Sequence, residues 1–203
     1  MILSISSFYF KLGLFVEPSF FDGNVCSKLR SEVKKAQGIP SRIFYKGYID
    51  IDDNLRRSKT LNVSQNTISF AKKRLLFIKP RIEASFNTVL EDCQNPHFLL
   101  YKEGDFFHPH KDNSDREESP NWFKDRKISV VIFLNSEAEK PKRNSYVGGG
   151  LTFYQLANIP PFDTKGFRII GKAGMLVAFR SDILHEVTEV KYGERYSIVS
   201  WFY

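Results

Sequence analysis

The chain has 203 residues, of which 42% are hydrophobic and 15% aromatic. A chain of this size and composition buries a sizeable core and matches one globular domain, which excludes an intrinsically disordered segment. Its only cysteines, Cys26 and Cys93, form no CxxC pattern, so a disulfide framework is excluded and a reducing, cytoplasmic setting is indicated. No apolar run approaches the roughly 18 residues of a membrane span, so we expect a soluble protein.

The net charge of +7 is unevenly distributed. Between Lys28 and Arg81 the sequence carries 14 basic and four acidic residues, which leaves 16 basic and 19 acidic residues elsewhere. Such a basic segment could attract an acidic substrate, RNA or DNA. A solvated Lys/Arg face on amphipathic helices gives the same pattern, and we favour that interpretation.

The first elements are predicted from apolar runs and capping residues. We expect Met1–Val16, which is fairly apolar, to form a first strand. Asp22 or Asn24 can cap a helix over Val25–Ala36, and Gly38 ends it.

A polar stretch and a second, longer helix follow. Residues Ile43–Ser58, broken by Gly47 and several Asp, predict a short strand and then a mobile loop. From about Ser64 to Leu90 apolar residues recur at three-, four- and seven-residue steps, which predicts an amphipathic helix that Pro80 should kink or split. These apolar positions are Ile68, Leu75, Ile78, Ile82, Phe86 and Val89.

After Pro96 the sequence changes to short β-type runs separated by turn residues. Many short strands with little helix between them indicate an antiparallel sandwich or barrel, with the helices of the first half packed on one of its faces. Asn113–Lys127 is expected to be a long loop between strands. The predicted strands are Phe98–Tyr101, Ile128–Leu134, Gly150–Tyr154, Met175–Phe179 and Tyr196–Tyr203.

One short pattern points to metal chemistry. His110 and Asp112 stand two residues apart, and residues i and i+2 of a strand point to the same face, so both can bind one metal ion. Two histidines and one carboxylate on one face of an octahedron leave three positions open, as in non-haem Fe(II) oxygenases. Among the other histidines, His108 is the immediate neighbour of His110 on the same strand face and His97 precedes the strand, so His185 is the preferred third ligand.

Arg195 follows His185 by ten residues. A turn at Lys191–Glu194 would fold the next strand back antiparallel, which predicts that Arg195 lies alongside the strand region of His185. Its guanidinium could there pair with the far carboxylate of a dicarboxylate co-substrate whose other end chelates the metal. No GK[ST] follows Gly148–Gly150, so we expect a tight turn or bulge there rather than a phosphate-binding loop.

With these residues in view, the sequence resembles the prolyl 4-hydroxylase-like branch of the Fe(II)/2-oxoglutarate-dependent dioxygenases. The resemblance is specific over about Phe98–Tyr203, where order, spacing and flanking residues agree, and it is looser before that range. The matching segments are YKEGDFFHPHKD (Tyr101–Asp112), GGLTFY (Gly149–Tyr154), FRSDILHEV (Phe179–Val187) and GERYS (Gly193–Ser197), which leads to Trp201 and Phe202.

The resemblance implies a double-stranded β-helix, or jelly roll, with iron at one open end. The jelly-roll core would cover about 96–203, and a helical leader over about 17–95 would pack on it within a single domain. The implied iron ligands, which are also the implied catalytic residues, are His110, Asp112 and His185.

The implied co-substrates are 2-oxoglutarate and O₂, with ascorbate as a candidate reductant. Arg195 would bind the distal carboxylate of 2-oxoglutarate, Tyr101 would donate a hydrogen bond toward it, and Ser197 would add a further contact. The implied reaction is oxidative decarboxylation of 2-oxoglutarate to succinate and CO₂, coupled to oxidation of a substrate. Because Asp112 supplies a carboxylate ligand, hydroxylation is favoured over halogenation.

The implied substrate is a peptidyl side chain, with prolyl as the first candidate, or a small amino-acid-like molecule. Collagen-type prolyl hydroxylases usually have Lys where this chain has Arg195, which weakens a collagen-like substrate. Arg180, Lys111 and Trp122 are candidate substrate contacts, and the pair Arg56 and Arg57 is a further candidate for the substrate entrance. One alternative is an oxidative demethylase of nucleic acid, which has a second Arg where this chain has Trp201. The other is a catalytically silent jelly-roll binding module, which would have no need of the intact ligands.

Overall fold

The structure is a computed structural model that describes residues 5–45, 48–156 and 166–203. Its helices are α1 (Ile5–Lys11), α2 (Gly23–Val33), α3 (Gln65–Phe86) and α4 (Asn121–Lys124). The strands are β1 (Leu14–Glu17), β2 (Gly38–Pro40), β3 (Ile43–Tyr45), β4 (Tyr48–Asp50), β5 (Arg56–Arg57), β6 (Lys59–Leu61), β7 (His97–Tyr101), β8 (Phe106–His110), β9 (Ile128–Phe133), β10 (Tyr146–Gly148), β11 (Leu151–Phe153), β12 (Phe167–Ile169), β13 (Leu176–Arg180), β14 (His185–Val187), β15 (Val190–Gly193) and β16 (Arg195–Phe202).

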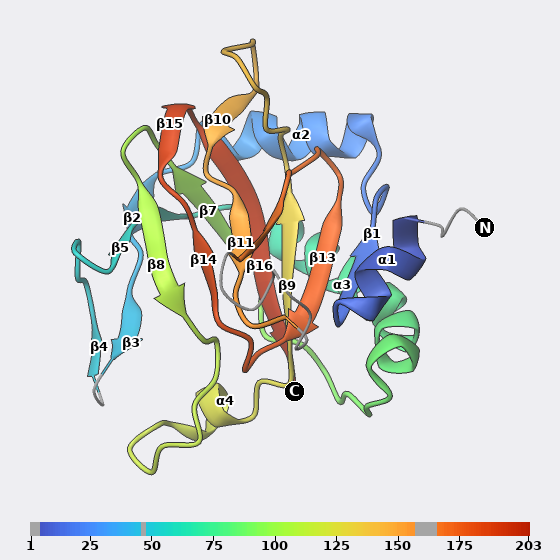
Figure 1. Ribbon diagram of the computed structural model, residues 1–203. Helices are drawn as coiled ribbons and strands as arrows, with labels where there is room; N and C mark the ends of the chain where they lie inside the picture. The colour runs from blue at the N-terminus through green and yellow to red at the C-terminus, as the bar shows by residue number, and fades with distance from the viewer. Residues whose placement is uncertain (1–4, 46–47, 157–165) are drawn as a thin grey trace.

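Two antiparallel sheets face each other (Figure 1). Within the described residues, the larger sheet has the strand order β1-β13-β9-β16-β7-β6-β2, and the smaller has the order β12-β11-β14-β8-β5. Strands β7, β8 and β9, and likewise β13 and β14, follow one another in the chain and alternate between the two sheets. This alternation is that of a jelly roll, the fold expected from the sequence.

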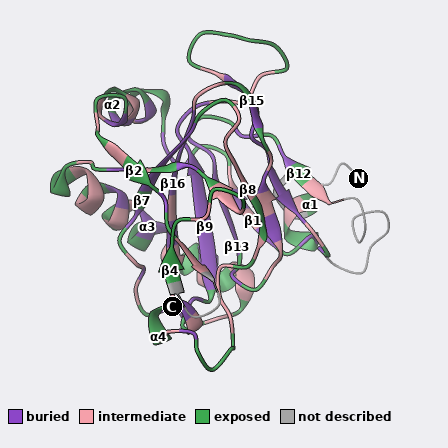
Figure 2. Cartoon of the chain, turned by 90° about the vertical axis from the view of Figure 1, so that its left-hand side faces the viewer, coloured by how far each residue is buried: buried purple, intermediate pink, exposed green. Residues whose placement is uncertain are grey.

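Strand β9 shows how the sheet is buried on both faces. Ile128, Val130 and Ile132 belong to a core cluster that includes α2 and α3, whereas Val131 and Phe133 belong to the cluster between the sheets. Side chains alternate along a strand, so one six-residue run contributes to two cores. In Figure 2 the central strands are accordingly buried, while the outer sides of the helices are exposed.

The two long helices pack on the outer face of the larger sheet, as predicted. The Asp22 side chain accepts a hydrogen bond from the backbone N–H of Val25 at 2.8 Å and caps α2, and Ser64 caps α3. Glu32 of α2 accepts hydrogen bonds from the Ser64 backbone and from the Thr67 hydroxyl, which joins the two helices at their polar ends.

Helix α3 runs through Pro80 without being split, although the sequence predicted a kink or a split there. Pro80 and Leu76 are both exposed, so the carbonyl that loses its helical hydrogen bond lies on the solvent side. The helix ends at Phe86, and Asn87 follows in the left-handed conformation with φ of 46°. Val89 was predicted on the apolar face but lies beyond the helix and is 78% exposed.

Two predictions for the first 60 residues were wrong. The first segment is not one strand, because residues 5–11 form α1, which ends before Gly13, and only residues 14–17 form β1. A short apolar run fits either period, and α1 is set by packing of Tyr9 and Phe8 on Phe167.

The segment 43–58 is also more regular than predicted. It forms the β3–β4 hairpin and strand β5, and β5 joins the smaller sheet. No described helix is long and apolar enough to cross a membrane.

Leu75 and Leu76 provide a matched test of the helix packing. Leu75 is fully buried in the core cluster, whereas Leu76, the next residue of α3, is 37% exposed. Leu75→Ala should lower the free energy of unfolding by about 2–5 kcal/mol, since it leaves a cavity. Leu76→Ala should cost less than about 1 kcal/mol. Urea denaturation followed by circular dichroism measures both, and equal losses would contradict the packing of α3 on the sheet.

Candidate active site

Two paired strands of the smaller sheet bring the predicted ligands together. His110 is the last residue of β8 and His185 is the first of β14, and the register places them directly opposite each other. Asp112 lies two residues beyond the end of β8, where its backbone N–H donates to the Ser181 carbonyl at 2.9 Å. This bond turns the chain so that the carboxylate reaches both imidazoles, even though Asp112 is outside the strand.

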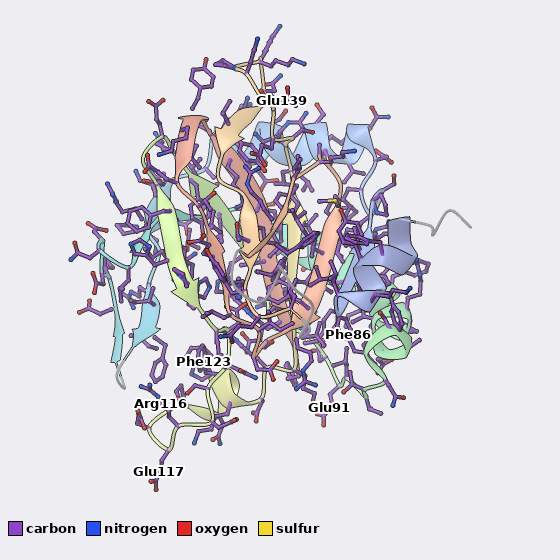
Figure 3. The ribbon with its side chains drawn as sticks, in the orientation of Figure 1. Phe86, Glu91, Arg116, Glu117, Phe123 and Glu139 are labelled. Carbon is purple, nitrogen blue, oxygen red and sulfur yellow. The ribbon has the colours of Figure 1, made fainter. Side chains whose placement is uncertain are left out.

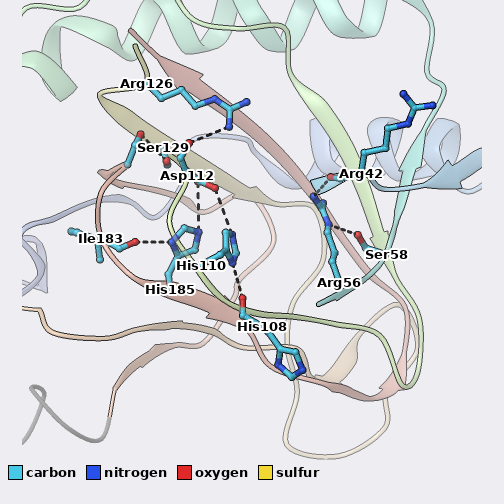
Figure 4. Close-up of polar contacts among 11 residues, drawn as sticks. Arg42, Arg56, Ser58, His108, His110, Asp112, Arg126, Ser129, Ile183 and His185 are labelled. Atoms are coloured by element: carbon cyan, nitrogen blue, oxygen red, sulfur yellow. Dashed lines mark hydrogen bonds and ion pairs between the residues drawn. The ribbon is translucent and has the colours of Figure 1, made fainter. Parts of the chain in front are cut away.

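The three side chains form a compact donor set (Figure 4). His110 Nε2 lies 3.5 Å from Asp112 Oδ1, and His185 Nε2 lies 3.6 Å from Asp112 Oδ2. The ligand atoms all lie within 4.8 Å of one another, so they could hold one metal ion. Two imidazoles and a carboxylate that occupy one face suit a six-coordinate Fe(II) with open positions.

The backbone fixes which nitrogen of each ring faces the metal position. His110 Nδ1 lies 2.8 Å from the carbonyl oxygen of His108, and His185 Nδ1 lies 2.9 Å from that of Ile183. A carbonyl oxygen can only accept, so each Nδ1 donates its proton and each Nε2 keeps a free lone pair. Such outer hydrogen bonds set the orientation and basicity of metal-binding histidines.

Electrostatics favour the protonation states that metal ligands require. Burial, together with the neighbouring His110, lowers the pKa of the His185 imidazole to about 4 against the opposing effect of Asp112. Burial alone would raise the pKa of Asp112, but His185, His110 and Arg126 outweigh that effect and hold it well below its usual range. At neutral pH the site therefore presents a neutral imidazole at His185 and an ionised carboxylate.

Arg195 lies across the cavity from these side chains, in the larger sheet. It is 1% exposed, and its register pairs it with Tyr101 of β7. Nη1 donates to the Ser197 hydroxyl at 3.0 Å, whereas Nε and Nη2 are buried with no hydrogen-bond partner among the described residues. The guanidinium carbon lies 5.2 Å from the centre of the Tyr101 ring and 5.1 Å from that of Phe133.

A buried cation with two unpartnered nitrogens fits an anionic ligand. Leaving such a group desolvated and unpaired is costly, and a carboxylate can accept from Nε and Nη2 at once. Gly149 makes room for the arginine, because a Cβ there would lie 3.0 Å from the Arg195 Cδ. Gly148 and Gly149 have positive φ, and the pairing with β15 shifts at Gly148, which confirms the predicted bulge.

One cavity of about 770 Å³ is lined by the three metal-ligand candidates and by Arg195, Tyr101 and Ser197. Arg195 lines this cavity through a strand pairing that differs from the predicted one. Strand β16 pairs with β7 and β9 of the larger sheet rather than with β14, so Arg195 faces His185 across the barrel instead of alongside it. The metal-ligand candidates and Arg195 therefore line the same cavity from opposite sheets.

The predicted substrate contacts have different positions. Lys111 and Trp122 line the cavity, and Trp122 is 44% exposed. Arg180 is not part of the lining, and its guanidinium makes two hydrogen bonds to Asp182. The 113–127 segment, predicted as a long loop, contains the short helix α4, and Arg116 and its neighbours lie at its outer tip (Figure 3).

Two cavity residues, Arg126 and His97, were given no role in the site from the sequence. Arg126 is 7% exposed, donates to Gln94 and to the backbone carbonyl of Asp112, and stacks on Trp201 at 3.6 Å. Arg56, which was expected with Arg57 at the substrate entrance, lines the cavity, whereas Arg57 does not. His97, which begins β7 rather than preceding it, packs on Trp201 and lies outside the metal-ligand group.

Comparison with known proteins agrees with this geometry. The family model described as the 2OG-Fe(II) oxygenase superfamily matches residues 96–203. A PKHD-type hydroxylase from Shewanella oneidensis is 36% identical over 107 residues, which are 52% of this chain and 41% of that protein. The chain thus spans less than half the length of this relative.

Solved structures are similar in fold. A Pseudomonas putida prolyl-4-hydroxylase superimposes with a TM-score of 0.65 at 23% identity, over 94% of this chain and 91% of that one. A Trichoplax adhaerens prolyl hydroxylase, in complex with a peptide fragment of the hypoxia inducible factor oxygen degradation domain, gives a TM-score of 0.69 at 18% identity, over 94% and 83%.

The donor set predicts strong binding of a divalent metal. His185→Ala or His110→Ala should weaken Co(II) binding by at least about 100-fold, because each removes one of three protein ligands. His108→Ala is the matched control, since its ring is exposed and only its backbone carbonyl contacts His110. Isothermal titration under anaerobic conditions measures the affinities. Unchanged Co(II) binding by both ligand variants would exclude this site.

Proposed function

Because the chain belongs to the 2OG-Fe(II) oxygenase superfamily, whose family model matches residues 96–203, we propose that it hydroxylates a peptidyl side chain. A prolyl residue is the first candidate target, and a small amino-acid-like molecule is the second. We also propose that 17–95 and 96–203 form a single domain that works in the cytoplasm. The two free cysteines, both buried, accord with a reducing setting.

The observation that carries this proposal is the pairing of two sites in one cavity. The group of His110, Asp112 and His185 faces a buried arginine with two unpartnered nitrogens, Arg195. A metal site alone would suit many functions, and a buried arginine alone could belong to many folds. Their combination suits Fe(II) together with 2-oxoglutarate, which needs a metal at one end and a cation at the other.

Each protein group has a proposed task. His110, Asp112 and His185 would hold the iron, and the carbonyls of His108 and Ile183 would keep the imidazoles oriented. Arg195 would bind the distal carboxylate of 2-oxoglutarate, with Ser197 fixing its guanidinium and Tyr101 donating a hydrogen bond to the same carboxylate. When bound, iron and 2-oxoglutarate supply the oxidation: with O₂ they yield succinate, CO₂ and one oxygen atom in a substrate C–H bond.

The peptide substrate is supported by the relatives and by the shape of the site. The similar structures include prolyl hydroxylases, one of them in complex with a peptide fragment, and the curated relative is a PKHD-type hydroxylase. The cavity is large enough for several residues, since about 300–1,000 Å³ accommodates a drug-sized ligand. Exposed apolar side chains, Ile49 and Trp122, line it and offer contacts for such a chain.

The nucleic-acid alternative has weaker support. Of the 14 basic residues between Lys28 and Arg81, only Arg42 and Arg56 line the cavity within the described part of the chain. Trp201 stands where the demethylases have a second arginine, and it stacks against Arg126. The intact donor set opposes the catalytically silent module.

Co-substrate binding gives the first test. Succinate should form from 2-oxoglutarate in the presence of Fe(II) and O₂, and Arg195→Gln should raise the KM for 2-oxoglutarate by at least about tenfold, because a charge-assisted pair is lost. Arg195→Lys should have a smaller effect, since it keeps the charge and loses the planar fork. Titration of 2-oxoglutarate into Co(II)-loaded protein gives the binding affinity independently of turnover.

The matched control is Arg81→Gln, which removes a surface arginine paired with Glu17. It should leave the KM unchanged. Mass spectrometry of proline-containing peptides after turnover tests the substrate class, because a hydroxylated peptide gains one oxygen atom. Equal affinity of the wild type and Arg195→Gln for 2-oxoglutarate would overturn the co-substrate assignment.

A further inference from the structure

The cavity is lined by cations that have no carboxylate partner. Arg56 and Arg126 both line it, and neither guanidinium forms an ion pair with a described residue. By contrast, the lining residues Glu118 and Asp182 are each paired with an arginine, Arg116 and Arg180 respectively. Asp115 is the remaining acidic lining residue apart from Asp112, so positive charge predominates.

Arg56 is held close to the metal site. Its Nε donates to the Ser58 hydroxyl at 2.8 Å, and its Nη1 donates to the Arg42 carbonyl at 3.3 Å. The guanidinium lies 4.6 Å from the centre of the Phe107 ring, which stacks in turn on the His110 ring at 3.4 Å. Arg56 is therefore one aromatic ring away from a proposed iron ligand, and its Nη2 makes no hydrogen bond to a described residue.

Arg126 lies on another side of the same group (Figure 4). Its Nε and Nη2 donate to the Gln94 side chain, and its Nη1 donates to the Asp112 backbone carbonyl at 3.2 Å. Burial lowers its pKa to about 10, against the opposing effect of Asp112, so it is still charged at neutral pH. The attraction to Asp112 offsets only part of the desolvation cost of this buried guanidinium, and an incoming anion would offset more of it.

We propose that Arg56 and Arg126 bind an acidic group of the peptide substrate, carried close to the residue that is hydroxylated. This inference rests on the proposed function for the identity of the chain that enters the cavity. Carboxylate and phosphate present the same oxygens to a guanidinium fork, so Glu, Asp or a phosphorylated residue could supply the anion. Arg42 is not included, because its guanidinium points away from the metal-ligand group (Figure 4).

Tryptophan fluorescence can report ligand binding at the proposed anion subsite. Trp122 and Trp201 are its only two tryptophans, and both line the cavity. Arg126 lies 5.0 Å from the Trp122 ring and 3.6 Å from the Trp201 ring, so a ligand at this arginine should alter the intrinsic fluorescence. Binding can thus be measured without turnover.

The experiment uses the full chain loaded with Zn(II) and 2-oxoglutarate, which keeps the site filled and inactive. Pools of five-residue peptides with a central proline are equilibrated with the immobilised protein, and mass spectrometry measures enrichment. One pool has Glu and Asp among its flanking residues, a second has Gln and Asn instead, and a third has phosphoserine. Selected peptides are then titrated by tryptophan fluorescence.

The acidic or the phosphorylated pool should be enriched about tenfold or more over the neutral pool, which is the size of effect expected for a charge-assisted pair. The preference should fall with rising salt, because the ion pair is partly screened. Arg56→Gln should reduce it to less than about threefold, and Arg126→Lys should weaken it by a smaller factor because the charge is retained. The comparison between pools shows whether carboxylate or phosphate is the preferred source.

Arg57→Gln is the matched control. Arg57 is the next residue of β5, is exposed, stacks on Phe106 and does not line the cavity. It should keep the full preference. Binding of 2-oxoglutarate to each variant shows that it is folded.

The outcomes separate this proposal from the proposed function. Equal enrichment of the three pools, no binding of any pool, or a preference that survives Arg56→Gln would each overturn the subsite. Tighter, Arg56-dependent binding of a single-stranded oligonucleotide would overturn the peptide in favour of nucleic acid. If the wild-type protein forms no succinate from 2-oxoglutarate, the proposed function is instead overturned. An acidic preference without hydroxylation would support the subsite and reject proline as the target.

Discussion

The register between β8 and β14 is the constraint on which the candidate site depends. It places His110 opposite His185, and the pairing shifts between His185 and Val187. Because successive side chains point to opposite faces, a slip of one residue would turn one imidazole away from the other. The hydrogen bond from Asp112 to the Ser181 carbonyl extends this constraint beyond the strand, where no ladder holds the chain. The three proposed ligands are thus positioned by backbone geometry.

A second constraint is that the fold buries two arginines, Arg195 and Arg126, without giving either a salt bridge to a described carboxylate. Arg195 and Arg126 are 1% and 7% exposed, and neither forms an ion pair with a described residue. Aromatic rings lie against both guanidiniums, which offsets part of the desolvation cost through cation–π contacts. The remaining desolvation cost is present in the ligand-free protein. Anionic ligands should therefore gain affinity here from relieving a cost already present.

The sequence predicted the parts of this site that local patterns encode. The spacing of His110 and Asp112, the capping residue Asp22 and the bulge at Gly148–Gly150 were all recognisable over a few residues. The neighbours of Arg195 were not, because its strand pairs with β7, almost a hundred residues earlier in the chain. Arg126 had no recognisable pattern at all. Its role arises from Gln94 and Trp201, which only the tertiary fold brings to it.

The two sides of the cavity differ in construction, and one contact links them. Apart from Asp112, the proposed iron and 2-oxoglutarate side is built on strands, which hold side chains within the narrow tolerances that catalysis requires. Much of the proposed substrate side comes from the β3–β4 hairpin and the 113–127 segment. Arg56 is the exception, because β5 pairs with β8 and sets Arg56 opposite Phe107, whose ring stacks on His110. An anion bound at Arg56 would therefore act next to the strand that orients the proposed metal ligand, so the proposed anion subsite and the proposed metal site would be coupled through the pairing of β5 with β8.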